Sequence, residues 1–480
     1  MIKNDLKVLL VVPNFRWTEW DVNTLWHYIP YNLCLLASMI RDICDVKILD
    51  ANIDNLTKSD LADKIKEYNP NIIGITILMD QYGKAGHISA QIAKEVNKDI
   101  ITIFGGVYAT INSDYIMKDK NIDIVVIGEG EYILRNLVLY FKREGNLPVN
   151  GISYRKDGLV INTGHSSFIS DLDKLPLPAY DLVDLKKYIY LKDRKSVDSP
   201  PLYPYMRIFS SRGCPIGCTF CQVKDIMGKS FRKRSAENVL KEIRYLMENY
   251  GIKSIIFDDD NLIMDRQRAI DLFKGLKELK ILWLAIALAA FKLDKGLFKI
   301  MKECGCIYVD IAIESASPRI LKDIIKKPIN LNKIKEVVSW GKEFGIFIAG
   351  NFMIGFPTET WEEIRKTIKF AEELDMDYVK IFDVIPLRHT ELWDMCEEHG
   401  HFKKGFNQKN IRWNVGQLES NEYNSNDLTI LRAYEWDRIN FSSKEKIEKI
   451  ANRMNISCDK LEDITRETRK NVVDTLIGNQ

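Results

Sequence analysis

Two stretches of the chain alternate short apolar runs with segments of helical periodicity. In the first stretch each apolar run is nearly free of polar residues, as in strands that are buried in a parallel sheet. These runs are Val8–Val12, Val46–Leu49, Ile72–Leu78, Ile100–Phe104 and Ile122–Ile127. The intervening segments with helical spacing are Tyr31–Arg41, Lys58–Glu67, Lys84–Val96 and Glu131–Phe141. The alternation predicts an α/β domain with a doubly wound sheet over residues 1–145.

The second stretch repeats the alternation, with strands expected at the following positions. They are Arg207–Ser210, Ile255–Phe257, Ile281–Ala287, Tyr308–Ile313, Phe347–Ile354 and Tyr378–Ile385. Ser235 is a suitable N-cap for a helix that runs to Tyr250. Six βα units predict a partial (β/α)6 barrel over residues 204–400, with its chemistry at the carboxyl ends of the strands.

The remaining segments lack this alternation. Residues 146–203 are predicted to be a linker, which begins with a hairpin over Gly151–Val160 that turns at Asp157-Gly158. Its later part contains Pro176 and Pro178, which exclude a regular helix there. Residues 401–480 are predicted to form a helical region, with helices over Asn426–Asn440, Ser443–Met454 and Asp459–Leu476.

Composition excludes several classes of protein. The chain has a hydrophobic content of 46%, a charged content of 28% and a formal net charge of +2, which is typical of a globular protein. Such a balance gives no electrostatic case for binding nucleic acid or an anionic membrane. The sequence has no apolar run of about 18 residues, so no membrane span is expected. The first residues lack the apolar core of a signal peptide, and we expect a cytoplasmic protein.

The densest chemical motif is the segment Ser211–Cys221, which contains Cys214, Cys218 and Cys221 in the spacing C-x3-C-x2-C. Its two glycines and one proline favour a tight loop. Thiolates are ligands for zinc or for iron–sulfur clusters. Because a structural zinc ion normally has four protein ligands, three cysteines indicate an open and reactive site. The residues alone leave a zinc loop or a coincidence as alternatives.

This segment resembles the signature of the radical S-adenosylmethionine (SAM) superfamily, including the aromatic Phe220 before the last cysteine. The resemblance implies that the three cysteines bind three irons of a [4Fe–4S] cluster and that the fourth iron binds SAM. An electron from the cluster then cleaves SAM to a 5′-deoxyadenosyl radical. Such enzymes require a one-electron reductant of the flavodoxin or ferredoxin type.

Further motifs follow the predicted barrel strands. Asp258, Asp259 and Asp260 are consecutive acids that would repel one another unless a cation or donor lies near them. A solvated loop or a magnesium site would also explain them. The resemblance instead implies that Asp259 or Asp260 lies near the SAM amino group, without separating the two. It also implies that Glu314 and Ser315 contact the SAM ribose, and that the motif containing Gly355 lines the adenine.

The carboxyl ends of the first five strands form the ligand-binding edge of a doubly wound sheet. The residues expected along this edge are Asn14, Thr76, Gly105, Gly106, Gly128, Glu129 and Gly130. Glycines would let a large planar ligand approach the backbone. Spacing alone leaves open that they are only turn residues of a structural domain.

The motifs Gly105–Thr110 and Asp123–Glu131 resemble the flavodoxin-like cobalamin-binding domain of class B radical SAM proteins. Members often have a histidine after the paired glycines, where this chain has Tyr108. The chain also lacks the Asp-x-His-x-x-Gly motif of other cobalamin domains, and His87 is expected to be a surface residue of a helix. The resemblance therefore implies bound cobalamin with no histidine nitrogen on the cobalt, and the lower face of the cobalt is expected to be empty, bound by water or covered by Tyr108.

Together the resemblances imply a cobalamin-dependent radical SAM enzyme with a [4Fe–4S] cluster, SAM and cobalamin as cofactors. The reaction that they favour is methylation of an unactivated carbon through a 5′-deoxyadenosyl radical and methylcobalamin. Ring closure, ring contraction or hydroxylation by the same cofactors is the alternative. A sensor without turnover and a methylthiotransferase are weaker hypotheses. The substrate, a small molecule or a peptide, is not readable from the sequence.

Overall fold

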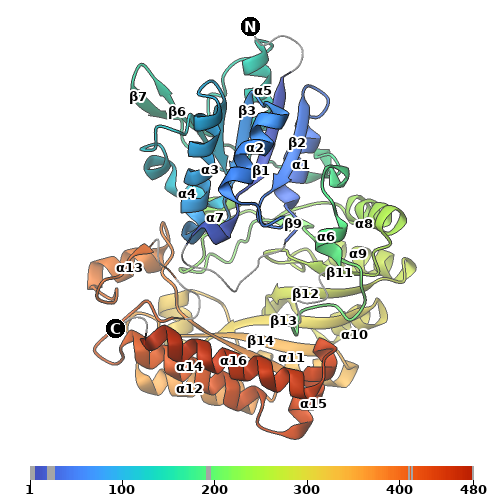
Figure 1. Ribbon diagram of the computed structural model, residues 1–480. Helices are drawn as coiled ribbons and strands as arrows, with labels where there is room; N and C mark the ends of the chain where they lie inside the picture. Colours follow the sequence, from blue (N-terminus) through green and yellow to red (C-terminus); the bar gives the residue numbers. More distant parts are fainter. Residues whose placement is uncertain (1–5, 19–27, 191–195, 409–410, 412–414, 478–480) are drawn as a thin grey trace. The chain divides into compact units, whose positions relative to one another are not determined.

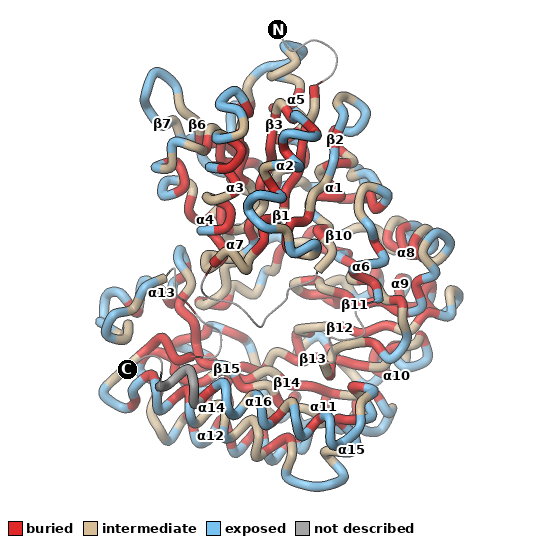
Figure 2. Tube along the Cα trace, viewed as in Figure 1, coloured by how far each residue is buried: buried red, intermediate tan, exposed pale blue. Residues whose placement is uncertain are grey.

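A computed structural model describes residues 6–18, 28–190, 196–408, 411 and 415–477 of the chain. The chain divides into two compact units, each with its own sheet. The first unit comprises residues 1–191 with 225–228 and 407–410, and the second comprises residues 192–224, 229–406 and 411–480. In both units the central strands are mostly buried, whereas the edge strand β7 (Leu159–Asn162) of the first unit is largely exposed (Figure 2).

The first unit is built on a seven-stranded sheet in the order β2-β1-β3-β4-β5-β6-β7. The first five strands in sequence are parallel, and β6 and β7 are antiparallel. The strands are β1 (Lys7–Val12), β2 (Asp45–Asp50), β3 (Ile72–Thr76), β4 (Ile101–Gly105), β5 (Ile124–Val126), β6 (Ile152–Lys156) and β7 (Leu159–Asn162). The strand order reverses between β1 and β3, where doubly wound sheets bind their ligands.

Helices cover both faces of this sheet and create two hydrophobic cores (Figure 1). On one face, α1 (Tyr31–Ile40) and α5 (Glu131–Lys142) contribute the buried residues. On the other face, α2 (Lys58–Tyr68), α3 (Gly83–Val96) and α4 (Val107–Ile116) do so. The predicted doubly wound α/β fold is therefore confirmed.

The segment expected to be a linker belongs largely to this first unit. The hairpin β6–β7 pairs with β5 and so extends the sheet. Its turn has φ values of 50° at Asp157 and 80° at Gly158, as a two-residue hairpin turn requires. The proline-rich part packs on α1, where Asp181 pairs with Arg41 at 2.8 Å. The short helix α6 (Lys186–Ile189) follows. Two expected strands are shorter than predicted, because β3 ends at Thr76 and β5 spans only Ile124–Val126.

The second unit contains a six-stranded parallel sheet in the order β15-β14-β13-β12-β11-β8. Its strands are β8 (Tyr205–Ile208), β11 (Ser254–Phe257), β12 (Leu282–Leu288), β13 (Cys306–Glu314), β14 (Phe347–Ile354) and β15 (Tyr378–Asp383). The helices of the barrel are α8 (Ala236–Tyr250), α9 (Arg266–Glu278), α10 (Lys295–Glu303), α11 (Leu331–Phe344), α12 (Trp361–Glu373) and α13 (Glu391–His399). Ser235 caps α8 by accepting a hydrogen bond from the Asn238 amide, as predicted. The sheet keeps two edges, β8 and β15, so the predicted partial barrel is confirmed.

Three C-terminal helices complete the second unit: α14 (Ser425–Asn440), α15 (Lys444–Met454) and α16 (Cys458–Ile477). Asn440 at the end of α14 pairs with the edge strand β15. Its Oδ1 accepts from the Val379 amide at 2.8 Å, and its Nδ2 donates to the Val379 carbonyl at 2.8 Å. Trp436 donates to the Tyr378 hydroxyl at 3.0 Å, whereas Trp413 lies outside the described residues. The C-terminal helices thus cover a strand edge that would otherwise be unpaired.

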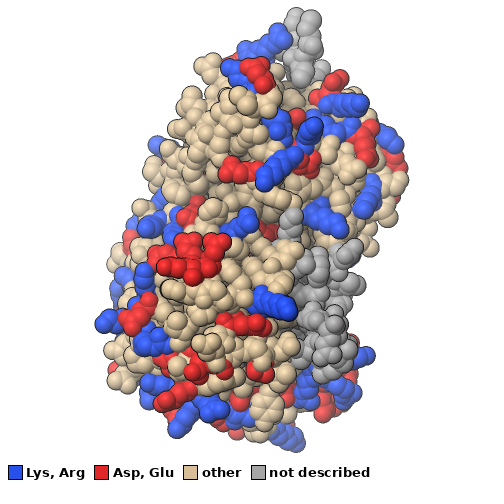
Figure 3. Space-filling model, turned by 90° about the vertical axis from the view of Figure 1, so that its left-hand side faces the viewer, with Lys and Arg blue, Asp and Glu red and all other residues tan. Residues whose placement is uncertain are grey.

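On the face shown in Figure 3, basic and acidic side chains are interspersed over much of the surface. Within the described part of the chain, no helix combines the length and apolar character needed to cross a membrane.

We predict that Asn440→Ala destabilises the second unit by about 2–5 kcal/mol, because it leaves a buried amide and a buried carbonyl of Val379 unpaired. Denaturant unfolding followed by tryptophan fluorescence measures this change. Asn249→Ala is the matched control, since Asn249 is exposed and its side chain donates to a carbonyl one turn earlier in α8. Equal stability of the two variants would contradict the proposed role of Asn440.

Candidate cofactor sites

The three candidate cluster ligands lie on one loop that follows β8 and precedes the short helix α7 (Val223–Ile226). Gly213 and Gly217 have φ values of 82° and 73°, in the region that favours glycine. Cys218 is buried, while Cys214 and Cys221 are partly exposed. The glycines thus let the loop bend tightly enough to present three thiols.

The interior of the loop is fixed to the barrel through Thr219, which is fully buried. Its amide donates to the Ile325 carbonyl at 3.1 Å, and its hydroxyl donates to the Ile324 carbonyl at 2.6 Å. The Thr219 carbonyl accepts from the Leu392 amide at 3.1 Å. The ring of Phe220 lies near that of Phe356, with the centroids 6.4 Å apart. The polar groups between the second and third cysteines are therefore satisfied by barrel residues.

The acids after β11 divide into three different roles. Asp258 forms an ion pair with Arg207 at 2.5 Å. Asp259 is buried, and its Oδ1 accepts from the Ser210 amide at 3.0 Å, from the Ser210 hydroxyl at 2.8 Å and from the Ser211 hydroxyl. Burial raises the pKa of Asp259 to about 6. Asp259 therefore fixes the start of the cysteine loop.

Asp260, the third of these acids, lies near the cysteines. Its Oδ2 accepts from the Gly213 amide at 3.0 Å, and its Oδ1 has no partner among the described residues. Burial raises the pKa of this carboxyl, which also interacts electrostatically with Cys214 and Cys221. Each of the two acids that the sequence could not separate keeps one oxygen without a hydrogen-bond partner among the described residues, Oδ2 in Asp259 and Oδ1 in Asp260. Asp260 is the acid that interacts with Cys214 and Cys221, and its oxygen is therefore the one beside the cysteine loop.

The electrostatic setting of the thiols fits an iron–sulfur cluster. Burial raises the pKa of Cys218 to about 12 and that of Cys221 to about 11, so cluster binding has to displace protons. Among the described residues, no group of three or more His, Cys, Asp or Glu side chains is placed to hold one metal ion. In a [4Fe–4S] cluster each cysteine binds a different iron, so its thiolates need not converge on a single point.

A buried cation next to the cysteine loop was not recognised in the sequence. Lys327 donates to Glu314 Oε1 at 2.7 Å and to the Ala312 carbonyl at 2.8 Å, and both charged side chains are buried. Burial alone would lower the pKa of Lys327, but Glu314 and the nearby Cys218 outweigh it and raise this pKa. Only the fold brings Lys327 to Glu314, because nothing in the spacing marks the lysine.

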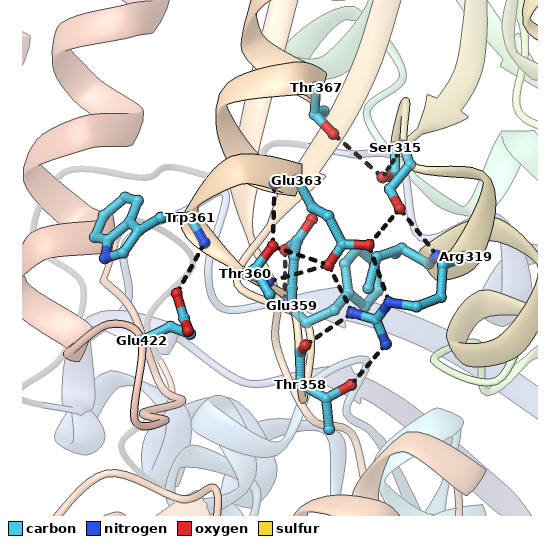
Figure 4. A network of polar contacts seen from close by, with 12 residues as sticks. Ser315, Arg319, Thr358, Glu359, Thr360, Trp361, Glu363, Thr367 and Glu422 are labelled. Carbon is cyan, nitrogen blue, oxygen red and sulfur yellow. Dashed lines mark hydrogen bonds and ion pairs between the residues drawn. The ribbon is translucent and has the colours of Figure 1, made fainter.

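Ser315, expected at the SAM ribose, instead lies in a polar network that joins β13 to α12 (Figure 4). Its fully buried hydroxyl is 3.2 Å from the Thr367 hydroxyl and accepts from the Ser317 amide at 3.1 Å. The network continues through Glu363, which pairs with Arg319 at 2.6 Å. Burial opposes ionisation, but the bonds from Arg319 and Ser317 hold the pKa of Glu363 at about 2. Ser315 is thus engaged in packing, while the preceding Glu314 faces Lys327.

Gly355, expected beside the adenine, has a structural reason to be glycine. Its φ is 86°, and a Cβ there would lie 2.5 Å from Leu428 Cδ1 in α14. The turn is held by Glu359, whose Oε2 accepts from the Gly355 amide at 2.8 Å and from the Phe356 amide at 3.0 Å. Burial raises the pKa of Glu359 to about 8. A side chain at position 355 would point towards α14, so a larger residue there would disturb the packing of α14.

In the first unit, the edge formed by the carboxyl ends of β3 and β4 is open to a ligand. A Cβ on Gly105 would meet nothing within 4 Å. At Gly106, with φ of 92°, a Cβ would lie 2.8 Å from the Ile77 carbonyl oxygen and 2.9 Å from Thr76 Oγ1. The Thr76 hydroxyl accepts from Asn32 at 2.8 Å. Such a glycine-lined edge fits a large planar group such as a corrin ring, for which Gly105, Gly106 and Thr76 would supply the surface.

At the loop that follows β5, residues from a later segment of the chain pack against the ligand edge. Gly128 has a φ of 95°, and a Cβ there would lie 2.3 Å from His165 Cε1. The carboxylate of Glu129 accepts from the Ile169 amide at 2.6 Å. A Cβ on Gly130 would make only ordinary contacts with Leu36. Glu129 therefore holds the segment after the hairpin, and Gly128 leaves room for a histidine that the sequence did not single out.

Three further residues differ from their expected placement. Asn14 is buried, and its amide donates to the Leu56 carbonyl at 3.0 Å, so it supports the loop after β2. Tyr108 is only 6% exposed and packs between α3 and α4, where a Cβ on Gly83 would lie 2.5 Å from its ring. His87 is half-buried rather than a surface residue, and its Nδ1 is 2.7 Å from Asp119 Oδ2. The expected covering of a ligand by Tyr108 does not fit this packing.

Comparison with known proteins identifies both units. The sequence profile described as B12 binding domain matches residues 23–138. The profile of the Radical SAM superfamily matches residues 208–371. The two profiles thus match the parts of the chain that carry the glycine-lined edge and the cysteine loop.

Similar proteins cover most of the chain. An uncharacterized methyltransferase of Pyrococcus horikoshii is 38% identical over 81% of this chain and 83% of its own length. The cytidylyl-2-hydroxyethylphosphonate methyltransferase of Streptomyces wedmorensis is 30% identical over 82% of each chain. The anaerobic magnesium-protoporphyrin IX monomethyl ester cyclase of Rubrivivax gelatinosus is 29% identical over 78% of this chain and 66% of its own.

Among solved structures, the cobalamin-dependent SAM radical enzyme OxsB, with aqua-cobalamin and SAM bound, superposes with a TM-score of 0.73. It is 19% identical, and the match covers 94% of this chain and 71% of OxsB, which shows a shared fold. The two profiles and the relatives that cover most of the chain show that it belongs to the radical SAM superfamily, in the group whose members also carry a B12-binding domain. The protein is a cobalamin-dependent radical SAM enzyme.

Proposed function

We propose that this enzyme methylates an unactivated carbon atom of its substrate and uses SAM as both methyl donor and radical source. The observation that carries the proposal is an open three-cysteine loop, with a carboxylate oxygen of Asp260 available beside it, in a chain that also has a glycine-lined cobalamin edge. Two of the relatives are named as methyltransferases.

In this proposal the residues of the second unit bind and orient SAM. Cys214, Cys218 and Cys221 would hold a [4Fe–4S] cluster, with SAM bound beside it. Asp260 Oδ1 accepts a hydrogen bond from the SAM ammonium group, since its Oδ2 is already engaged by Gly213. The buried cation of Lys327 offsets part of the negative charge of the thiolates. The cluster supplies one electron and cobalamin supplies methyl-transfer chemistry that side chains lack.

The residues around the loop also restrict water. Thr219 and Phe356 are fully buried, and the ring of Phe220 lies near that of Phe356. Exclusion of water protects a carbon radical from side reactions. In the first unit, Gly105 and Thr76 would support the corrin, and Tyr108, which packs against α3, would not supply a ligand to the cobalt.

A second candidate function keeps the cofactors but transfers no methyl group. One relative is named as a cyclase, so ring closure belongs to the range of reactions in this family. The two functions differ in how SAM is consumed, because only a methyltransferase converts SAM to S-adenosylhomocysteine.

The deciding experiment therefore needs no knowledge of the substrate. Reconstituted protein is incubated anaerobically with a strong reductant, cobalamin and SAM that carries a deuterated methyl group. We expect S-adenosylhomocysteine and a deuterated methyl group on the bound cobalamin, together with slow release of 5′-deoxyadenosine. Formation of 5′-deoxyadenosine without S-adenosylhomocysteine would favour the non-methylating alternative and contradict the proposal.

Replacing Cys214, Cys218 and Cys221 together by alanine should remove the cluster. Native protein reconstituted without oxygen should hold about four iron and four sulfide per chain, and the triple variant almost none. Iron analysis and the visible spectrum measure this loss, and 5′-deoxyadenosine release should stop with it. Cys458→Ala is the control, since Cys458 is an exposed thiol outside the loop. Continued SAM cleavage by the triple variant would refute the assignment.

The two neighbouring acids should respond differently to replacement by alanine. Asp260→Ala should weaken SAM binding by about tenfold, as expected for loss of one charged hydrogen bond, and should retain its iron. Asp259→Ala should instead lose iron, because the bonds from Ser210 and Ser211 that shape the loop are gone. Calorimetry with SAM and iron analysis of both variants are the measurements. The opposite pattern would mean that Asp259 faces the ligand.

A further inference from the structure

After the hairpin β6–β7 the chain returns to the ligand edge of the first sheet. Ser166 is tied to this edge by its amide, which donates to the Ile127 carbonyl at 3.1 Å, and by its hydroxyl, which donates to the Glu129 carbonyl at 3.4 Å. The Ile169 amide donates to the Glu129 carboxylate at 2.6 Å, and the Gly164 carbonyl accepts from Gly151 at 3.1 Å. Residues 164–169 are therefore held against the loop that follows β5.

This attachment places the imidazole of His165 directly on Gly128. A Cβ on Gly128 would lie 2.3 Å from Cε1 and 2.8 Å from Nδ1 of the ring, so only glycine leaves room for it. The ring of Phe168 lies beside the imidazole, with the centroids 4.8 Å apart. His165 is exposed, yet its ring is restrained on two sides.

The hydrogen bond of this ring assigns its tautomer. His165 Nδ1 lies 2.7 Å from the Ser166 carbonyl oxygen. Because a carbonyl can only accept, Nδ1 carries the proton, and in the neutral ring Nε2 has a lone pair. Nε2 has no partner among the described residues. The ring therefore presents a hydrogen-bond acceptor at the ligand edge of the sheet.

The sheet order decides which part of a corrin this acceptor can meet. The centre of the ligand edge lies where the order reverses, between β1 and β3. β5 is three strands away from β1, or about 14 Å at the usual strand spacing, and is adjacent to β4 with its open Gly105. A corrin that lies on Gly105 would therefore have its rim, rather than its cobalt, near His165. The corrin rim carries carboxamide side chains, which are N–H donors.

We propose that His165 Nε2 accepts a hydrogen bond from a carboxamide at the rim of the corrin and so selects the fully amidated cofactor. This inference rests on the proposed function, because it requires cobalamin on the first unit. The acceptor comes from the segment after the hairpin, outside residues 23–138 that match the B12-binding profile.

The test measures the affinity of the full-length protein for cobalamin and for its b-, d- and e-monocarboxylic acids, each with one carboxamide hydrolysed. His165→Ala should weaken cobalamin binding about three- to tenfold, as expected for one hydrogen bond. His165→Gln, which keeps an acceptor, should recover part of the loss. Ser167→Ala is the matched control, because Ser167 is exposed and lies two residues away.

Selectivity separates recognition from a purely structural role. Native protein should discriminate against one of the three acids, and His165→Ala should lose that discrimination. Equal losses for all four corrinoids, or no loss, would overturn the inference. Nitrogen splitting in the cob(II)alamin EPR spectrum of native protein that disappears in His165→Ala would also overturn it, because His165 would then bind cobalt. Native protein that binds no corrinoid would instead refute the proposed function, and the inference with it.

Discussion

The burial of Asp259 is the constraint on which the candidate SAM site depends. A buried carboxylate needs hydrogen-bond donors, and here the amide of Ser210 and the hydroxyls of Ser210 and Ser211 all donate to Asp259 Oδ1. These residues begin the loop that carries the three cysteines. Arg268 also donates to the Ser210 carbonyl at 2.8 Å. The bonds to Asp259 Oδ1 thus fix the backbone from which the thiols project, while the next acid, Asp260, presents one oxygen beside the cysteines.

In the first unit, glycines rather than a buried charge determine the backbone of the ligand edge. At its ligand edge, Gly106 and Gly128 adopt positive φ values and allow neighbouring groups to approach within distances that a Cβ would forbid. Gly106 brings the start of α4 close to Thr76, and Gly128 admits the ring of His165. The backbone of this edge is therefore shaped by its own contacts, and Gly105 alone has open space above it among these three. In each unit the candidate ligand-facing position is one that the neighbouring residues leave open: Asp260 Oδ1 has no hydrogen-bond partner among the described residues, and a Cβ on Gly105 would meet nothing within 4 Å.

Much of the fold could be predicted because it follows from local periodicity. The apolar runs predicted every parallel strand of the two large sheets, and Ser235 marked the start of α8. Side-chain direction could not be predicted, since a motif fixes position along the chain only. Glu314 has a φ of 70° within an irregular part of β13, which accompanies a buried Ser315 bonded to α12. Lys327 and His165 gave no signal, because each gains its role only from residues distant in sequence. Residues 146–203 were predicted to be a linker, whereas the pairing of β6 with β5 and the packing of the proline-rich part on α1 join this segment to the first unit.

The central claim is that the cysteine loop holds a cluster whose fourth iron binds SAM. Electron–nuclear double resonance of the reduced cluster, with SAM labelled by ¹⁵N in its amino group and by ¹⁷O in its carboxylate, tests this claim most directly. The account predicts hyperfine coupling to both labels in native protein. It predicts that the coupling to the amino nitrogen weakens or disappears in Asp260→Ala while the cluster signal remains. A reduced cluster that shows no coupling to either label at saturating SAM would contradict the account.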